Sequence, residues 1–239
     1  MRLEQMRWAE VETYLQKDDR IILPIGSTEQ HGPRGILGTD GLVAEGIAVE
    51  VARRGGVLCA PVLMYGMAEH HLAFPGTLSL SPTTYQSVLK DLLKSFIHHG
   101  LNRVMIINGH GGNIGPVNCT LSEVVNTYLD LRVQFHSWFE LPVVEALTEQ
   151  LFQDREGGHG TPGEVSVTMH LFPDIEFPVL DHPPGLTGTN VFFNHKMIRE
   201  LSPSGLFGNA QPNLATADHG ASLMEAAVVD LVGRLDQWT

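Results

Sequence analysis

RIILPIGSTEQHG, residues 20–32, is the segment from which the architecture of this chain can be worked out. Its first half is an apolar run that is typical of a buried strand. Strands that end at water usually finish in Gly, Asn, Asp or Ser, because these residues form turns. This strand instead continues into Glu29 and His31, which are good metal ligands and also ordinary surface residues. The rest of the chain has to decide between these two interpretations.

Short apolar runs alternate with longer helical patterns along the chain. We expect strands at 20–26, 57–63, 103–109 and 131–138, and helices at 40–56, 81–100, 114–130, 140–153 and 221–238. The stretch 173–220 is rich in Pro, Gly and Asn, which predicts a long loop. Alternation of this kind indicates an α/β fold, with a mostly parallel central sheet and helices on both faces. No linker divides the chain, so we expect one domain over residues 1–239.

Composition excludes several classes of protein. The 239 residues carry a formal net charge of −12, and Arg53-Arg54 is the longest cationic cluster, which argues against nucleic acid as a partner. The N-terminus lacks the apolar core of a signal peptide, and no apolar run approaches the length of a membrane span. We therefore expect a soluble cytoplasmic protein. Cys59 and Cys119 each lie in an apolar stretch, which predicts buried free thiols rather than a disulfide.

Several acidic and imidazole side chains follow strands or open helices in this pattern. In open parallel sheets, ligands bind beyond the carboxyl ends of the strands. The first strand ends in GSTEQHG and the third in NGHGGN, so both polar clusters face one crevice. The candidate metal ligands are Glu29, His31, Asp40, His110 and Glu164.

Three of these candidates have plain structural interpretations. Asp40 is a favoured residue at the start of a helix and could simply cap it. His110 could be a loop histidine bonded to backbone. Glu164 forms a capping-box pattern with Thr161, in which the two residues bond to each other's backbone.

Taken together, the five candidates favour a metal site instead. A mixture of carboxylate oxygen and imidazole nitrogen suits zinc, manganese or iron, and no thiolate takes part. Three carboxylates and one bridging hydroxide balance the charge of two divalent ions. No G-x-S-x-G motif occurs, and no Walker lysine follows the glycines of NGHGGN. Paired carboxylates for glycoside hydrolysis stay open as an alternative, although they would not need the histidines.

Four ordered motifs resemble the creatininase (creatinine amidohydrolase) family. They are LPIGSTEQHGP…GTD, FPGTLSL, NGHGGN and GGHGTPGEVSVT, and the similarity runs from about residue 20 to 172. The resemblance implies a three-layer α/β/α fold and a site for two zinc, manganese or iron ions. It also implies hydrolysis of amide or related C–N bonds by a homo-oligomer, often a hexamer.

The resemblance also implies roles for individual residues. Glu29 and His110 would hold one metal, His31 the other, and Asp40 would bridge them. His159 would stand near the substrate as a proton donor or orienter. Trp138 occupies the place of one of two tryptophans that enclose creatinine in creatininases, and Arg155 appears where the other is expected.

One departure from the family pattern concerns a metal ligand. Creatininases have Tyr-Glu where this chain has Gly111-Gly112, and that glutamate is a ligand. We expect Glu164 to complete the second metal site in its place.

These inferences predict a metal-dependent amidohydrolase that uses a metal-bound hydroxide against a small cyclic or linear amide. His159 would be the general acid, and Glu164 is counted with it as catalytic. Arg155 could pair with a substrate carboxylate, which favours an anionic substrate over creatinine. The alternative is a non-catalytic metal-binding relative with a regulatory or scaffold role.

Overall fold

A parallel four-stranded sheet forms the centre of the computed structural model, which describes residues 1–187 and 192–238. The strands are β1 (Arg20–Ile25), β2 (Leu58–Cys59), β3 (Arg103–Asn108) and β4 (Arg132–Ser137), in the order β2-β1-β3-β4. All three pairings are parallel. The carboxyl ends of β1, β3 and β4 therefore meet at one edge, where Ile25, Asn108 and Ser137 lie in register.

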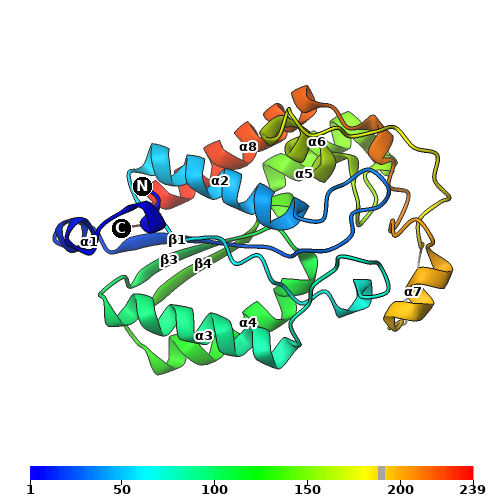
Figure 1. Ribbon diagram of the computed structural model, residues 1–239. Coiled ribbons are helices and arrows are strands. Elements are labelled where there is room, and N and C mark those ends of the chain that lie inside the picture. The colour runs from blue at the N-terminus through cyan, green and yellow to red at the C-terminus, as the bar shows by residue number, and fades with distance from the viewer. Residues whose placement is uncertain (188–191, 239) are drawn as a thin grey trace.

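Helices cover both faces of this sheet (Figure 1). On one face lie α2 (Thr39–Gly55), α5 (Pro142–Phe152), α6 (Pro162–Leu171) and α8 (Ala217–Asp236). On the other lie α3 (Pro82–His98) and α4 (Ile114–Thr127), while α1 (Trp8–Leu15) and α7 (His195–Leu201) sit at opposite ends of the molecule. The predicted three-layer α/β/α arrangement is confirmed.

Alternating strand residues divide the core into two apolar layers. Successive side chains of a strand point to opposite faces of the sheet. Ile22 and Met105 accordingly pack against the α2 and α8 side, whereas Ile21 and Val104 pack against the α3 and α4 side. Both faces of β1 and β3 are buried, which is why these strands read as continuous apolar runs.

Three predicted segments differ from the structure. The second strand is shorter than 57–63, because after Cys59 the chain leaves β1 and returns only through an isolated bridge between Leu63 and Ile25. The last helix begins at Ala217 rather than 221, since the Thr216 hydroxyl accepts a hydrogen bond from His219 N and caps it there. The stretch 173–220, predicted as loop, also contains α7; its residues 188–191 lie outside the described residues.

Two further expectations concern the surface. Cys59 is buried as predicted, but Cys119 is exposed, because it lies on the solvent side of α4. Within the described residues, every helix is too short or too polar to cross a membrane.

The crossing of α6 and α8 depends on Gly220. A Cβ at this position would lie 1.9 Å from the Ser166 carbonyl oxygen, so the two backbones touch where the helices cross. We expect Gly220→Ala to lower the free energy of unfolding by about 1–3 kcal/mol, the usual range for overpacking. Gly233→Ala on the same helix is the matched control, because a Cβ there meets nothing within 4 Å. It should be neutral or stabilising by up to about 1 kcal/mol. Urea unfolding measures both, and equal effects would contradict this account of the crossing.

Candidate metal centre

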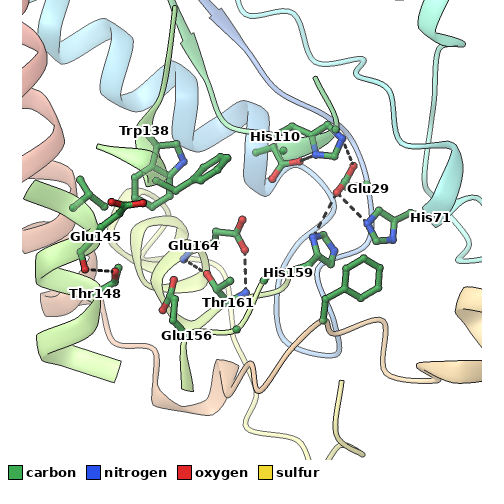
Figure 2. Close-up of a pocket in the computed structure, with 18 of the residues that line it drawn as sticks. Glu29, His71, His110, Trp138, Glu145, Thr148, Glu156, His159, Thr161 and Glu164 are labelled. Carbon is green, nitrogen blue, oxygen red and sulfur yellow. Dashed lines mark hydrogen bonds and ion pairs between the residues drawn. The ribbon is translucent and has the colours of Figure 1, made fainter. Parts of the chain in front are cut away.

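The four candidates nearest the strand ends form one buried cluster beyond the sheet edge. Glu29 and His31 follow β1, His110 follows β3, and Asp40 stands in the first turn of α2. Their exposed fractions are 0%, 1%, 4% and 2%, respectively. Figure 2 shows Glu29 and His110 facing each other in the wall of a cavity.

The first turn of α2 reaches this cluster because two glycines let it approach the strand ends. A Cβ at Gly109, after β3, would lie 2.1 Å from the Asp40 carbonyl oxygen, and one at Gly26, after β1, would lie 2.3 Å from Gly41 N. No side chain caps α2, whose N-cap residue is Gly38, so the capping interpretation of Asp40 is wrong. Its carboxylate is directed instead at two histidines.

The Asp40 carboxylate lies between His31 and His110. Its Oδ1 is 2.8 Å from His31 Nε2, and its Oδ2 is 3.1 Å from His110 Nδ1. The outer nitrogens face backbone carbonyls: His31 Nδ1 is 3.1 Å from Glu29 O, and His110 Nε2 is 3.0 Å from Met67 O. A carbonyl oxygen only accepts, so each outer nitrogen carries a proton. In the neutral ring, the inner nitrogen is then a free lone pair, which is the arrangement of metal-ligating histidines.

Three carboxylate oxygens in this cluster lack hydrogen-bond partners. They are Glu29 Oε1, Glu29 Oε2 and Asp40 Oδ2, all buried. A buried charge is costly unless it is paired, so the site calls for a cation. Three sets of residues each bring three potential ligand atoms within 4.8 Å of one another. They are Glu29, Asp40 and His110; His31, Asp40 and Glu164; and Glu29, His31 and His159. The donor set therefore fits a metal ion such as zinc, manganese or iron.

Protons neutralise the cluster when no metal is bound. Burial lowers the pKa of His31, but the nearby carboxylates, Asp40 above all, outweigh burial and raise it to about 10. The pKa of His110 is likewise raised despite burial, by Glu29 and Asp40. Against its own burial, the pKa of Asp40 is held well below its usual range by His31 and His110. A metal ion must displace these protons in order to bind.

Glu164 combines the two interpretations that the sequence left open. Thr161 N donates to Glu164 Oε2 at 2.9 Å, and Glu164 N donates to Thr161 Oγ1 at 3.1 Å, so the capping box at the start of α6 is formed. A carboxylate oxygen of the same residue also lies within 4.8 Å of ligand atoms of His31 and Asp40. Capping therefore does not remove Glu164 from the site.

His159 lies in the same cavity with a defined tautomer. Its Nε2 is 2.7 Å from the Gln30 carbonyl oxygen, which can only accept, so Nε2 carries the proton. Burial, followed by the charge of His31, lowers the pKa of His159 and favours the neutral ring. Its Nδ1 is then a free base, 3.7 Å from Glu29 Oε1. In this state His159 accepts a proton before it can donate one.

The cavity has a volume of about 450 Å³, and Trp138 forms part of its wall (Figure 2). Acidic residues dominate its polar lining: Glu29, Asp40, Glu145, Glu156 and Glu164. Among the described residues that line it, none is Lys or Arg. Arg155 stands outside this lining, and its Nε donates to Phe152 O. The predicted contact between Arg155 and substrate stays a prediction, since Arg155 is absent from this lining.

The sequence analysis missed several residues of the cavity, among them His70, His71, Glu156 and Phe207. His71 is 1% exposed, and its Nε2 lies 3.5 Å from Glu29 Oε1. Because His70 and His71 precede the FPGTLSL motif, that motif offered a signal for them. Phe207 comes from the stretch predicted as loop, where no periodicity marks a buried side chain.

Comparisons with known proteins agree with this fold. The family model "Creatininase: Creatinine amidohydrolase" matches residues 4–235. Creatinine amidohydrolase of Pseudomonas putida is 27% identical over 241 residues, covering 94% of this chain and 92% of that protein. The mycofactocin precursor peptide peptidase of Mycobacterium ulcerans is 28% identical, covering 92% and 85%. The chain belongs to the creatininase family, as the motifs predicted.

Solved structures give the same result. A crystal structure of creatinine amidohydrolase superimposes with a TM-score of 0.86 at 25% identity, covering 99% of this chain and 96% of that one. A Zn–Zn form and an Mn form of creatininase match with TM-scores of 0.82 and 0.83, at 25% and 26% identity, each covering 99% of this chain and 97% of that one.

The buried carboxyl of Glu156 predicts a pH dependence of stability. Burial, together with the charge of Glu164, raises its pKa to about 7. A pKa raised on folding contributes stability below the unfolded value of 4.5, and this contribution is lost as the pH rises through about 7. Glu156→Gln should therefore gain about 2–3 kcal/mol of stability relative to the unmodified protein between pH 4 and pH 8. Urea unfolding of both metal-free proteins across this range measures the difference in the free energy of unfolding. If this free energy changes with pH in the same way for both proteins, the raised pKa of Glu156 is contradicted.

Proposed function

We propose that this chain is a metal-dependent amidohydrolase that holds two divalent ions and hydrolyses the C–N bond of a small amide. The observation that carries the proposal is the placement of Asp40, whose two oxygens each face the inner nitrogen of a different histidine. One carboxylate can thus serve two neighbouring metal positions. Membership of the creatininase family supports the reaction class.

In this proposal Glu29, Asp40 and His110 hold one ion, and His31, Asp40 and Glu164 hold the other. When bound, two such ions supply an activated water and polarise the amide carbonyl. Zinc, manganese and iron all suit the donor set, and the Zn–Zn and Mn forms of creatininase support the first two.

Glu164 would take the place of the acid that is missing at Gly112. A Cβ at Gly112 would lie 2.3 Å from His110 Nε2 and 2.4 Å from Met67 O. The backbone here thus leaves no room for a side chain, because the hydrogen bond from His110 to Met67 occupies that space. A ligand for the second ion has to come from another wall of the cavity, and α6 supplies Glu164.

The remaining residues would move the proton and hold the substrate. His159 accepts a proton at Nδ1, the nitrogen left free by its bond to the Gln30 carbonyl, and then returns it to the leaving nitrogen. Trp138, which is 2% exposed, offers an aromatic wall to the substrate. No Lys or Arg lines the described cavity, so it offers an anionic substrate no side-chain cation, contrary to the inference from Arg155.

The alternative of a non-catalytic metal-binding relative has less support. A structural metal site is closed by protein ligands, whereas a catalytic one keeps a position open to substrate. Here the ligand cluster borders a cavity of about 450 Å³ that also presents His159 and Trp138. These features have no use in a storage or scaffold site.

We further propose that the protein is a homo-oligomer. Trp8, Leu129 and Phe192 are 79%, 87% and 103% exposed, respectively. Because these side chains do not form one contiguous patch (Figure 1), the proposal rests on the resemblance to creatininases rather than on them.

Metal removal tests the function directly. We expect purified protein to hold up to two divalent ions per chain by elemental analysis. Dialysis against a chelator should abolish release of amine from a panel of neutral, cationic and anionic amides, and added zinc or manganese should restore it. Anionic amides should not be preferred over neutral ones, because no Lys or Arg lines the described cavity. Full activity in protein shown to be free of metal would refute the proposal.

Two variants distinguish the proposed metal ligand, Glu164, from the proposed proton carrier, His159. If Glu164 is a ligand, Glu164→Gln should remove one of the two ions and nearly all activity. If Glu164 is only a helix cap, the same change costs about 1 kcal/mol of stability and leaves the metal content unchanged. His159→Ala should keep both ions and lose about 10²–10⁴-fold in rate. Two tightly held ions in Glu164→Gln would exclude its ligand role, and unchanged turnover in His159→Ala would exclude proton transfer by His159.

A further inference from the structure

Gln30, between the candidate ligands Glu29 and His31, has a side-chain amide whose orientation is determined by two backbone groups. Gly32 N–H, which can only donate, lies 2.8 Å from Gln30 Oε1. The Gly205 carbonyl, which can only accept, lies 2.8 Å from Gln30 Nε2. The amide oxygen and nitrogen are therefore assigned without ambiguity.

This orientation determines the tautomer of His71. Gln30 Nε2 lies 2.9 Å from His71 Nδ1, and an amide nitrogen can only donate. His71 Nδ1 must therefore accept, so it carries no proton. The ring then holds its single proton on Nε2, the nitrogen that lies 3.5 Å from Glu29 Oε1 (Figure 2).

The backbone of Gln30 determines the tautomer of His159, a ring that presents its other nitrogen, Nδ1, to Glu29. Gln30 O accepts from His159 Nε2 at 2.7 Å, which leaves His159 Nδ1 without a proton. The two rings stack with their centroids 4.3 Å apart, and both inner nitrogens face Glu29 Oε1. One of these nitrogens is a donor and the other is a base.

We propose that Gln30 is a positioning residue that holds His71 and His159 both as the Nε2–H tautomer but with different nitrogens toward Glu29, so that His71 directs its N–H at Glu29 while His159 Nδ1 stays free to accept a proton. His71 is then not a metal ligand, although its ring lies as close to Glu29 as the others do. Glu29 Oε1 is buried and has no hydrogen-bond partner in the described structure. At 3.5 Å the His71 N–H is at the outer limit of hydrogen-bond length, and a small movement of either side chain brings it to Oε1.

The consequence for the reaction rests on the proposed function. Carboxylates that bind metal are held in turn by outer hydrogen bonds, which orient the oxygen that faces the ion. A donor on Oε1 would leave Oε2 free for the metal position that Glu29 shares with Asp40 and His110.

The tautomers can be read directly in metal-free protein, whether or not it is an enzyme. Long-range ¹H–¹⁵N spectra of protein labelled at histidine nitrogens distinguish protonated from unprotonated ring nitrogens. His71→Phe and His159→Ala assign the two spin systems by their loss. We expect His71 protonated on Nε2 alone and His159 on Nε2 alone. A proton on His71 Nδ1 would overturn the proposal.

Gln30→Glu tests the control by the amide. A carboxylate at position 30 accepts where the amide donated, so His71 Nδ1 should become protonated. His159 is the internal control in the same spectrum, because a backbone carbonyl holds it, and its tautomer should not change. An unprotonated His71 Nδ1 in this variant would show that Gln30 does not set it. If the variant does not fold, the spectrum of the unmodified protein still decides the assignment.

Metal affinity supplies the second readout. His71→Phe keeps an aromatic ring beside His159 but has no donor, and zinc affinity should fall about 10–100-fold, as for other outer partners of metal ligands. His71→Gln can place an amide N–H near the position of Nε2 and should recover part of this loss. Equal zinc affinity in the unmodified protein and His71→Phe would overturn the positioning role. Normal tautomers and normal zinc binding without amide hydrolysis would refute the proposed function alone.

Discussion

The Asp40 carboxylate, held between His31 and His110, is the interaction on which the rest of the site depends. Its two oxygens lie 2.8 and 3.1 Å from imidazole nitrogens that come from the ends of two neighbouring strands. The arrangement requires the first turn of α2 to touch the backbone at both strand ends, which Gly26 and Gly109 allow. The parallel sheet, the glycines after its strands and the start of α2 therefore act together to place one buried carboxylate.

Burying this much negative charge makes the site selective for cations. Backbone carbonyls hold the outer nitrogens of His31, His110 and His159, so each of these rings can offer a lone pair to the interior. His71 differs because a side-chain amide donates to it. All four residues are histidines, so their roles differ through the direction of their hydrogen bonds. These bonds leave His31 and His110 as candidate ligands, His159 as a base and His71 as a donor.

The departures from the creatininase pattern concern the second metal position and the substrate wall. The backbone at Gly112 is too crowded for a side chain, and Glu164 approaches from α6 while it also caps that helix. Arg155 bonds to backbone outside the cavity, so the described lining is acidic and carries no fixed cation. The chain thus keeps the family's fold, and its buried acid and imidazole cluster borders a cavity with no Lys or Arg in the described lining.

The sequence by itself determined the layers of the fold and most of the donor set. Apolar runs and helical periods are local patterns, and the rule that parallel strands end at one edge brings Glu29, His31 and His110 together without coordinates. Only the tertiary structure decided where individual side chains point. It showed that Asp40 is not a helix cap, that Arg155 is absent from the cavity lining, and that Gln30 bonds to His71, which lines the cavity beside Glu29. The physical reason is that these side chains are oriented by hydrogen bonds between segments far apart in the chain, such as the bond from Gln30 to Gly205. No local sequence pattern records which distant segments meet.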